Sequence, residues 1–163
     1  MMNRSLWYAS LVMMTYHTYG NGNVWHFDTC KPELTQTWKE AFRSPGAATL
    51  WHAKSFLTKI GWWKYVPDAS IIAEGEGGGR TRNVAMRSVE GDALAVYFAS
   101  SATVKLRLDK LTIGDKLAAR WTNPATGEER TAGVFAQHAA SFTSPVGWHD
   151  ARLRVYAQDH TRP

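Results

Sequence analysis

The sequence lacks several features that each identify a class of protein. Cys30 is the only cysteine among 163 residues, which excludes an internal disulfide framework. No HExxH or CxxC pattern occurs, and the six histidines are spread along the chain, so we expect no metal site and no cofactor. The sequence has no G-x-S-x-G motif, and the glycine-rich GEGGGR lacks the frame of a phosphate-binding loop.

Runs of like charge and long apolar runs are also scarce. The 19 Lys and Arg residues outnumber 14 Asp and Glu residues and give a net charge of +5, but they are scattered, so we predict no nucleic-acid partner. The apolar run in MMNRSLWYASLVMM is too short to span a bilayer and no signal-peptide cleavage site follows it. We therefore predict a packed helix over residues 1–14 and no membrane partner.

The hydrophobic pattern of the sequence changes near residue 67, from helical before it to strand-like after it. TQTWKEAFRS predicts a helix over residues 35–44 that stops before Pro45, and PGAATLWHAKSFLTKIG predicts a second helix over residues 46–60 that ends at Gly61. The aromatic linker WWKYVPD is expected to pack between two layers, since its rings would otherwise be exposed. These signals divide the chain into a helical segment, residues 1–66, and a second domain, residues 67–163.

The second domain has the hydrophobic period of β-strands. Eight short runs separated by turn signals are SIIAEGE, NVAMRSV, DALAVYFA, TVKLRLD, KLAARWT, TAGVFA, ASFTS and ARLRVYA. In TVKLRLD the alternation directs Val104, Leu106 and Leu108 inward and Lys105 and Arg107 outward, which fixes the register. The fold class is therefore mainly β, an antiparallel β-sandwich with an α-helical N-terminal segment.

Four stretches together carry a resemblance to a known family. They are HTYGNGNVW (17–25), WKEAFRSPGAATLWHAKSFL (38–57), VPDASIIAEGEG (66–77) and WTNPATGE (121–128). In this order and spacing they resemble the C-terminal end of the apiosidase-like glycoside hydrolases, from about Leu6 to Tyr156. In that family a (β/α)8 catalytic barrel is followed by a β-sandwich labelled as a collagen-binding domain.

The resemblance implies a place for each half of the chain. HTYG would end the last barrel strand, and the loop through Trp25 would lie at the mouth of the active site. His17, Tyr19 and Trp25 then correspond to positions that line the sugar-binding cleft. Because the family's catalytic acids lie on earlier barrel strands, the chain resembles a truncated or stand-alone descendant of the C-terminal end. The family also suggests a secreted or cell-surface bacterial protein.

Four acidic residues are the candidates for catalysis. Glycoside hydrolysis needs two carboxyl groups, about 5–5.5 Å apart for retention and about 6.5–9.5 Å apart for inversion. Glu74 and Glu76 project from one face of a predicted strand, about 7 Å apart, although a solvated strand end explains them better. Asp28 and Glu33 flank the aromatic loop but lack the fixed surroundings that catalysis requires. Whether the chain is an enzyme stays open; if it is one, we expect a glycoside hydrolase.

The eight tryptophans give the better functional signal. Sugar rings stack on exposed aromatic planes, whereas the same rings buried would form a core. We expect core positions for Trp38, Trp62 and Trp63. Three others adjoin loops and are the candidates for ligand binding, with His17 and Tyr19: they are Trp25, Trp121 and Trp148.

The leading hypothesis is a carbohydrate-binding accessory module, derived from a glycoside hydrolase, that binds a polysaccharide or oligosaccharide through aromatic side chains. The first alternative is a small glycoside hydrolase with a retained carboxylate pair. The second is a domain that binds collagen or another matrix protein. The apolar faces of the N-terminal helices need a cover, either the sandwich or a second copy of the chain, and of these we favour a homodimer.

Overall fold

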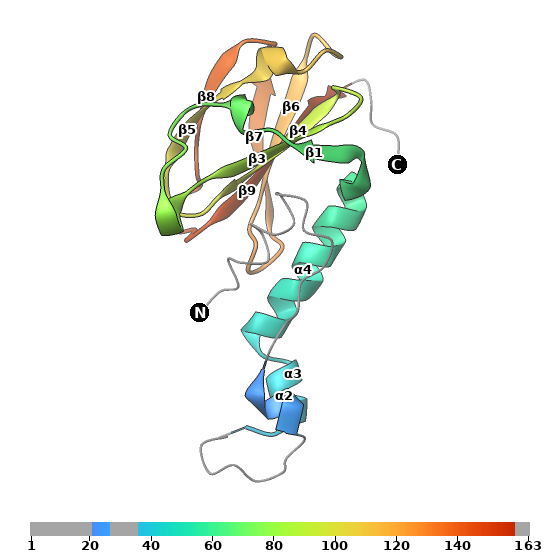
Figure 1. Cartoon of the computed structure of the whole chain (residues 1–163), viewed down its shortest axis with the longest axis vertical. Coiled ribbons are helices and arrows are strands. Elements are labelled where there is room, and N and C mark those ends of the chain that lie inside the picture. The colour runs from blue at the N-terminus through green and yellow to red at the C-terminus, as the bar shows by residue number, and fades with distance from the viewer. Residues whose placement is uncertain (1–20, 27–35, 159–163) are drawn as a thin grey trace.

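The computed structural model describes residues 21–26 and 36–158, and the predicted helix over residues 1–14 lies outside them. Figure 1 shows a β-sandwich from which the long helix α4 (Pro45–Ile60) extends. Two short helices, α2 (Gly22–His26) and α3 (Trp38–Phe42), contact each other at the far end of α4 (Figure 1). No helix in these two ranges is long and apolar enough to cross a membrane.

The sandwich consists of two antiparallel sheets. The six-stranded sheet has the order β1-β3-β4-β9-β6-β7, and the three-stranded sheet has the order β2-β5-β8. The larger sheet contains β1 (Tyr65–Pro67), β3 (Val84–Ser88), β4 (Ala93–Phe98), β6 (Leu117–Thr122), β7 (Glu129–Phe135) and β9 (Ala151–Ala157). The smaller sheet contains β2 (Ile72–Glu74), β5 (Thr103–Arg107) and β8 (Ala139–Thr143). The predicted fold class and all eight predicted strands are confirmed, and β1 is an additional strand within the aromatic linker.

Strand β4 shows how the layers are built. All six of its residues are buried, because one face of the strand packs on the three-stranded sheet and the other on α4. Leu94, Val96 and Phe98 belong to the core between the two sheets, while Ala95 and Tyr97 belong to the core beneath the helix. A strand covered on both faces loses the apolar–polar alternation of a half-exposed strand, which explains the continuous apolar run ALAVYF.

Strand β5 is covered on one face only. Val104, Leu106 and Leu108 are fully buried between the sheets, and Lys105 and Arg107 lie on the outer face. The predicted register is therefore confirmed. Burial of each leucine contributes about 1.5–3 kcal/mol, and a shift by one residue would bury two cations instead.

Helix α4 packs on the six-stranded sheet through one stripe of its surface. Ala53, Phe56 and Ile60 recur at three- and four-residue spacing and are buried in this interface. An ion pair between Lys59 Nζ and Glu129 Oε1, 2.8 Å long, links the same helix to β7. Partial burial acts to raise the pKa of Glu129, but hydrogen bonds from Lys59 and Arg120 outweigh it and lower the pKa below 4.5.

The helix boundaries follow from capping. Thr37 and Glu40 form a reciprocal capping box, so α3 begins at Trp38, three residues later than predicted. Helix α4 begins with Pro45 in its first turn and ends at Gly61, whose φ of 67° is the left-handed conformation of a helix C-cap. The prediction that WWKYVPD packs between layers is wrong for its two tryptophans, which form a short 3-10 turn, η1 (Trp62–Lys64), outside both cores.

Candidate functional site

The described part of the chain does not bring the predicted site residues together. His17, Tyr19, Asp28 and Glu33 lie outside the described residues. Trp25 lies on α2, at the end of the molecule farthest from the sandwich, and is 66% exposed. A single ligand cannot contact Trp25 and the sandwich tryptophans at once in this arrangement.

Trp121 and Trp148 belong to the core between the two sheets. Trp121 is 5% exposed, and its ring contacts those of Phe98 and Phe142 edge-on, with centroids 4.9 and 6.5 Å away. Trp148 is 6% exposed, and the guanidinium of Arg130 lies 4.8 Å from its ring centroid. Neither ring presents a free face for a sugar, so the expectation that both bind ligand is corrected: they stabilise the core.

The exposed rings lie on the helical segment instead. Within the described ranges, the large apolar side chains exposed before residue 66 are all aromatic: Trp25, Phe42, Trp51, Trp62 and Trp63. Those exposed beyond residue 66 are valines: Val89, Val134 and Val146. The sequence did not predict this division between exposed aromatic rings and exposed valines. Whether an aromatic side chain is exposed depends on the residues packed around it, which the sequence pattern does not identify.

Trp62 and Trp63 form an exposed aromatic pair. They follow the left-handed Gly61 at the junction between α4 and β1, and are 37% and 63% exposed. Their ring centroids lie 6.4 Å apart, with the ring planes at 79°. The two rings therefore present differently oriented faces to solvent rather than one flat strip.

The predicted carboxylate pair is neutralised by local cations. Glu74 Oε1 accepts a hydrogen bond from Lys105 Nζ at 2.7 Å, and Glu76 Oε1 lies 2.7 Å from Arg82 Nη2. The bond from Lys105, followed by its charge, lowers the pKa of Glu74. A general acid of a glycosidase needs a raised pKa, so Glu74 is unsuited to that role. In residues 21–26 and 36–158, no group of three or more His, Cys, Asp or Glu side chains is placed to hold a metal ion.

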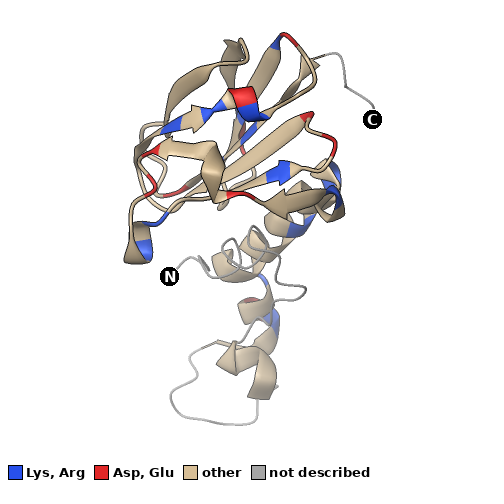
Figure 2. Cartoon of the chain, turned by 45° about the horizontal axis from the view of Figure 1, so that its top comes forward, with Lys and Arg blue, Asp and Glu red and all other residues tan. Residues whose placement is uncertain are grey.

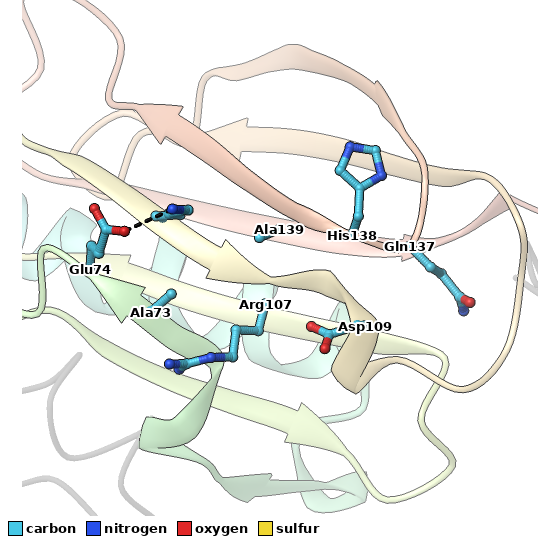
Figure 3. Close-up of a pocket in the computed structure, with 8 residues that line it drawn as sticks. Ala73, Glu74, Arg107, Asp109, Gln137, His138 and Ala139 are labelled. Atoms are coloured by element: carbon cyan, nitrogen blue, oxygen red, sulfur yellow. Dashed lines mark hydrogen bonds and ion pairs between the residues drawn. The ribbon is translucent and has the colours of Figure 1, made fainter.

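A polar groove lies on the outer face of the three-stranded sheet (Figure 3). It has a volume of about 470 Å³ and is open to solvent. Its lining comes from β2, β5, the turn η4 (Leu108–Lys110), the connection before β8 and the first residue of β8: Ala73, Glu74, Lys105, Arg107, Asp109, Gln137, His138 and Ala139. The outward direction of Lys105 and Arg107 was visible in the sequence, but the pairing of β5 with β2 and β8 was not.

Side chains in the groove are held by short contacts. Arg107 Nη1 donates to the carbonyl oxygens of Ser70 and Ile72 at 2.7 and 3.1 Å. Gln137 Nε2 donates to the Leu111 carbonyl oxygen at 3.0 Å. The groove thus presents donors and acceptors in fixed positions, and no Phe, Tyr or Trp ring lines it, so it can recognise a polar ligand through hydrogen bonds.

Comparison with solved structures identifies proteins that share this fold. One, named "Glycoside hydrolase", is 24% identical with a TM-score of 0.85, covering 96% of this chain and 36% of that chain. A glycoside hydrolase family 5 protein from Bacteroides vulgatus ATCC 8482 is 24% identical with a TM-score of 0.86, covering 97% of this chain and 36% of that chain. The chain therefore corresponds in fold to about a third of the length of each.

The sequence itself matches one family. No curated protein matches the chain. A family model described as "Putative collagen-binding domain of a collagenase" matches residues 66–153, which span the sandwich from the end of β1 into β9. Because this match covers more than half of the 163 residues, the chain belongs to the family described as "Putative collagen-binding domain of a collagenase".

Proposed function

We propose that the chain is a non-catalytic accessory module derived from an apiosidase-like glycoside hydrolase and that it binds polysaccharide through exposed tryptophans of its helical segment. The observation that carries the proposal is the exposed pair Trp62 and Trp63 at the junction of α4 with the sandwich. The fold shared with two glycoside hydrolases supports the connection to carbohydrate.

The geometry of this pair favours one form of ligand. A sugar ring stacks its C–H face on an indole plane, which provides apolar contact that hydroxyl groups cannot. Rings inclined at 79° cannot both lie on a flat crystalline surface. They can contact successive sugars of a chain that bends, so we expect soluble glucans or hemicelluloses to bind more tightly than crystalline cellulose.

The proposal excludes catalysis because the described carboxylates are already engaged. Glu74 is paired with Lys105 and Glu76 with Arg82. Each acid therefore faces its own cation rather than a shared space that would hold a glycosidic bond. Release of reducing ends from soluble polysaccharides, abolished by Glu74→Gln, would contradict this part of the proposal.

The binding part is tested by affinity electrophoresis in gels that contain soluble glucans or hemicelluloses. We expect the double variant Trp62→Ala/Trp63→Ala to lose at least about tenfold in affinity, since two stacking contacts are removed. Val146→Ala is the matched control, because Val146 is 93% exposed and lies on the sandwich. Equal retardation of the double variant and the wild type would contradict the proposal.

A second candidate function is binding to collagen or another matrix protein. The family description that matches residues 66–153 favours it. The same purified chain, applied to immobilised collagen and to the polysaccharide panel, separates the two functions. Retention on collagen without retention in any polysaccharide gel would replace the carbohydrate proposal.

We also propose a homodimer through the helical segment. Trp25, Phe42 and Trp51 are each 66% exposed, and a second copy would remove these apolar surfaces from water. Sedimentation velocity over a range of concentrations tests this arrangement. A species of monomer mass at every concentration would contradict it, and Trp51→Ser should weaken any dimer that forms.

A further inference from the structure

The groove on the three-stranded sheet contains charges that do not cancel within the protein. Lys105 and Glu74 neutralise each other across 2.7 Å. Arg107 makes no ion pair with a carboxylate in residues 21–26 and 36–158, and neither does Asp109 with a cation. The groove therefore presents one cation, Arg107 at the end of β5, and one anion, Asp109 on η4, and both are available to a ligand.

Hydrogen bonds hold the Arg107 guanidinium in place but occupy only one of its three nitrogens. A single nitrogen, Nη1, donates to both the Ser70 and the Ile72 carbonyl oxygens. Its other nitrogens, Nη2 and Nε, have no hydrogen-bond partner in the described part of the chain. Anchoring one arm reduces the entropy lost when the remaining N–H groups bind, and a guanidinium matches the two oxygens of a carboxylate in geometry and charge.

Figure 3 shows the polar side chains spread along the groove on either side of Arg107, with Glu74 toward one end and Asp109 and Gln137 toward the other. Asp109 follows on η4, and His138 stands on the β8 side of the groove. Hydroxyl groups of a ligand can donate to the carboxylate of Asp109 and accept from Lys105. Because no Phe, Tyr or Trp side chain lines the groove, hydrogen bonds are the main means of recognition. A ligand that uses the Arg107 guanidinium, the Asp109 carboxylate and the Lys105 ammonium group carries one carboxylate and several hydroxyl groups.

We infer that the groove binds a uronate residue of an acidic polysaccharide, with the sugar carboxylate on Arg107 and sugar hydroxyls on Asp109. Lys and Arg are spread over several strands and helices (Figure 2). The net charge of +5 favours a polyanionic chain over a neutral one, because it attracts such a chain before contact. The inference rests on the proposed function in one respect, that the ligand is a carbohydrate, but it uses a different surface from Trp62 and Trp63.

The test measures binding of polygalacturonate and of its fully methyl-esterified form to the full chain by affinity electrophoresis. Esterification removes the carboxylate charge and needs no change in the protein, so this comparison does not depend on the folding of any variant. We expect the wild type to bind the acid form at least about tenfold more tightly than the ester, since charged hydrogen bonds are lost.

Two variants assign the effect to the groove. Arg107→Gln should lose about tenfold in affinity for polygalacturonate, and Arg107→Lys should lose less, because it keeps the charge without the planar fork. Arg80→Gln is the control: Arg80 is exposed on the turn η3 (Gly79–Thr81), and the substitution removes the same charge from a site outside the groove. We expect it to change the affinity less than twofold, as scattered surface charge contributes little.

The outcomes separate the inference from the proposed function. Equal binding of acid and ester, or equal losses in Arg107→Gln and Arg80→Gln, would overturn the inference. Loss of polygalacturonate binding in Trp62→Ala/Trp63→Ala but not in Arg107→Gln would overturn it while supporting the aromatic site. Binding that depends on Arg107 and not on the two tryptophans would support the inference and contradict the aromatic site. Binding of acidic peptides but no polysaccharide would contradict both.

Discussion

Arg152→Met is the substitution that we expect to destabilise the protein most. Arg152 lies on β9 with 1% of its surface exposed, and its guanidinium is 4.4 Å from the ring centroid of Phe56 on α4. Nη1 donates to the His52 carbonyl oxygen at 3.5 Å, and Nη2 donates to the Asn123 carbonyl oxygen at 3.3 Å. One buried side chain therefore joins the helix, the turn after β6 and the sheet.

The expected magnitude follows from the charge that the substitution leaves behind. Burial lowers the pKa of Arg152 to about 9, and the negative charge of Asp150 acts against this shift. Asp150 is itself buried and accepts a hydrogen bond from the Tyr97 hydroxyl at 2.7 Å. Asp150 attracts Arg152 electrostatically, so Arg152→Met leaves a buried carboxylate without this compensating charge. Such a loss costs about 3–5 kcal/mol, which corresponds to a decrease of about 10 °C in melting temperature for a domain of this size.

Urea unfolding of four proteins measures this coupling: wild type, Arg152→Met, Asp150→Asn and the double variant. Methionine keeps the apolar stem, and asparagine keeps an acceptor for Tyr97. We expect the double variant to lose at least about 1 kcal/mol less than the sum of the single losses, because the pair is removed together. Arg80→Met, on the surface, should stay within about 0.5 kcal/mol of wild type. Additive losses, or less than about 1 kcal/mol for Arg152→Met, would refute the reasoning.

Two further predictions concern the contact between α4 and the sandwich. Gly127→Ala should lower the free energy of unfolding by about 1–2 kcal/mol or more, because Gly127 has a φ of 74° and a Cβ would lie 2.7 Å from Nδ1 of His52. Gly147→Ala, with a φ of 83° and open space around it, should lose only the backbone part, so an equal loss in both would exclude the steric contact. Glu129→Gln should reduce the acid sensitivity of the fold: the lowered pKa of Glu129 means that its stabilisation is present above about pH 4.5 and is lost as the pH falls through the folded-state pKa. Thermal unfolding at pH 7 and pH 3 measures this difference, which we expect to be about 1 kcal/mol or less for a partly exposed pair, and an identical pH dependence in both proteins would contradict it.

The strands were predictable because their signals are local. The alternation in TVKLRLD gave both the position of β5 and the side of the sheet on which Lys105 and Arg107 lie. Pro45 and Gly61 likewise defined the two ends of α4, since one fits the first helical turn and the other adopts the left-handed conformation. Such features depend only on residues within one turn or one strand, so the local sequence is enough to predict them.

The candidate site was less predictable, because exposure depends on neighbours that are distant in the sequence. Trp121 and Trp62 are both next to turn signals, yet Trp121 is enclosed by Phe98 and Phe142 from other strands and is 5% exposed, while Trp62 is 37% exposed. Only the packing of the two sheets on each other distinguishes a core ring from a surface ring.

The sequence by itself determined the strands, the helix ends and the outward direction of the charges on β5. The tertiary structure alone decided that β2, β5 and β8 lie side by side, which brings Glu74, Arg107 and His138 to one groove. It also decided that the sandwich buries its tryptophans while the helical segment exposes its own. The physical reason is that hydrophobic period and capping act over a few residues, whereas strand order and ring burial arise from contacts between residues more than 20 positions apart.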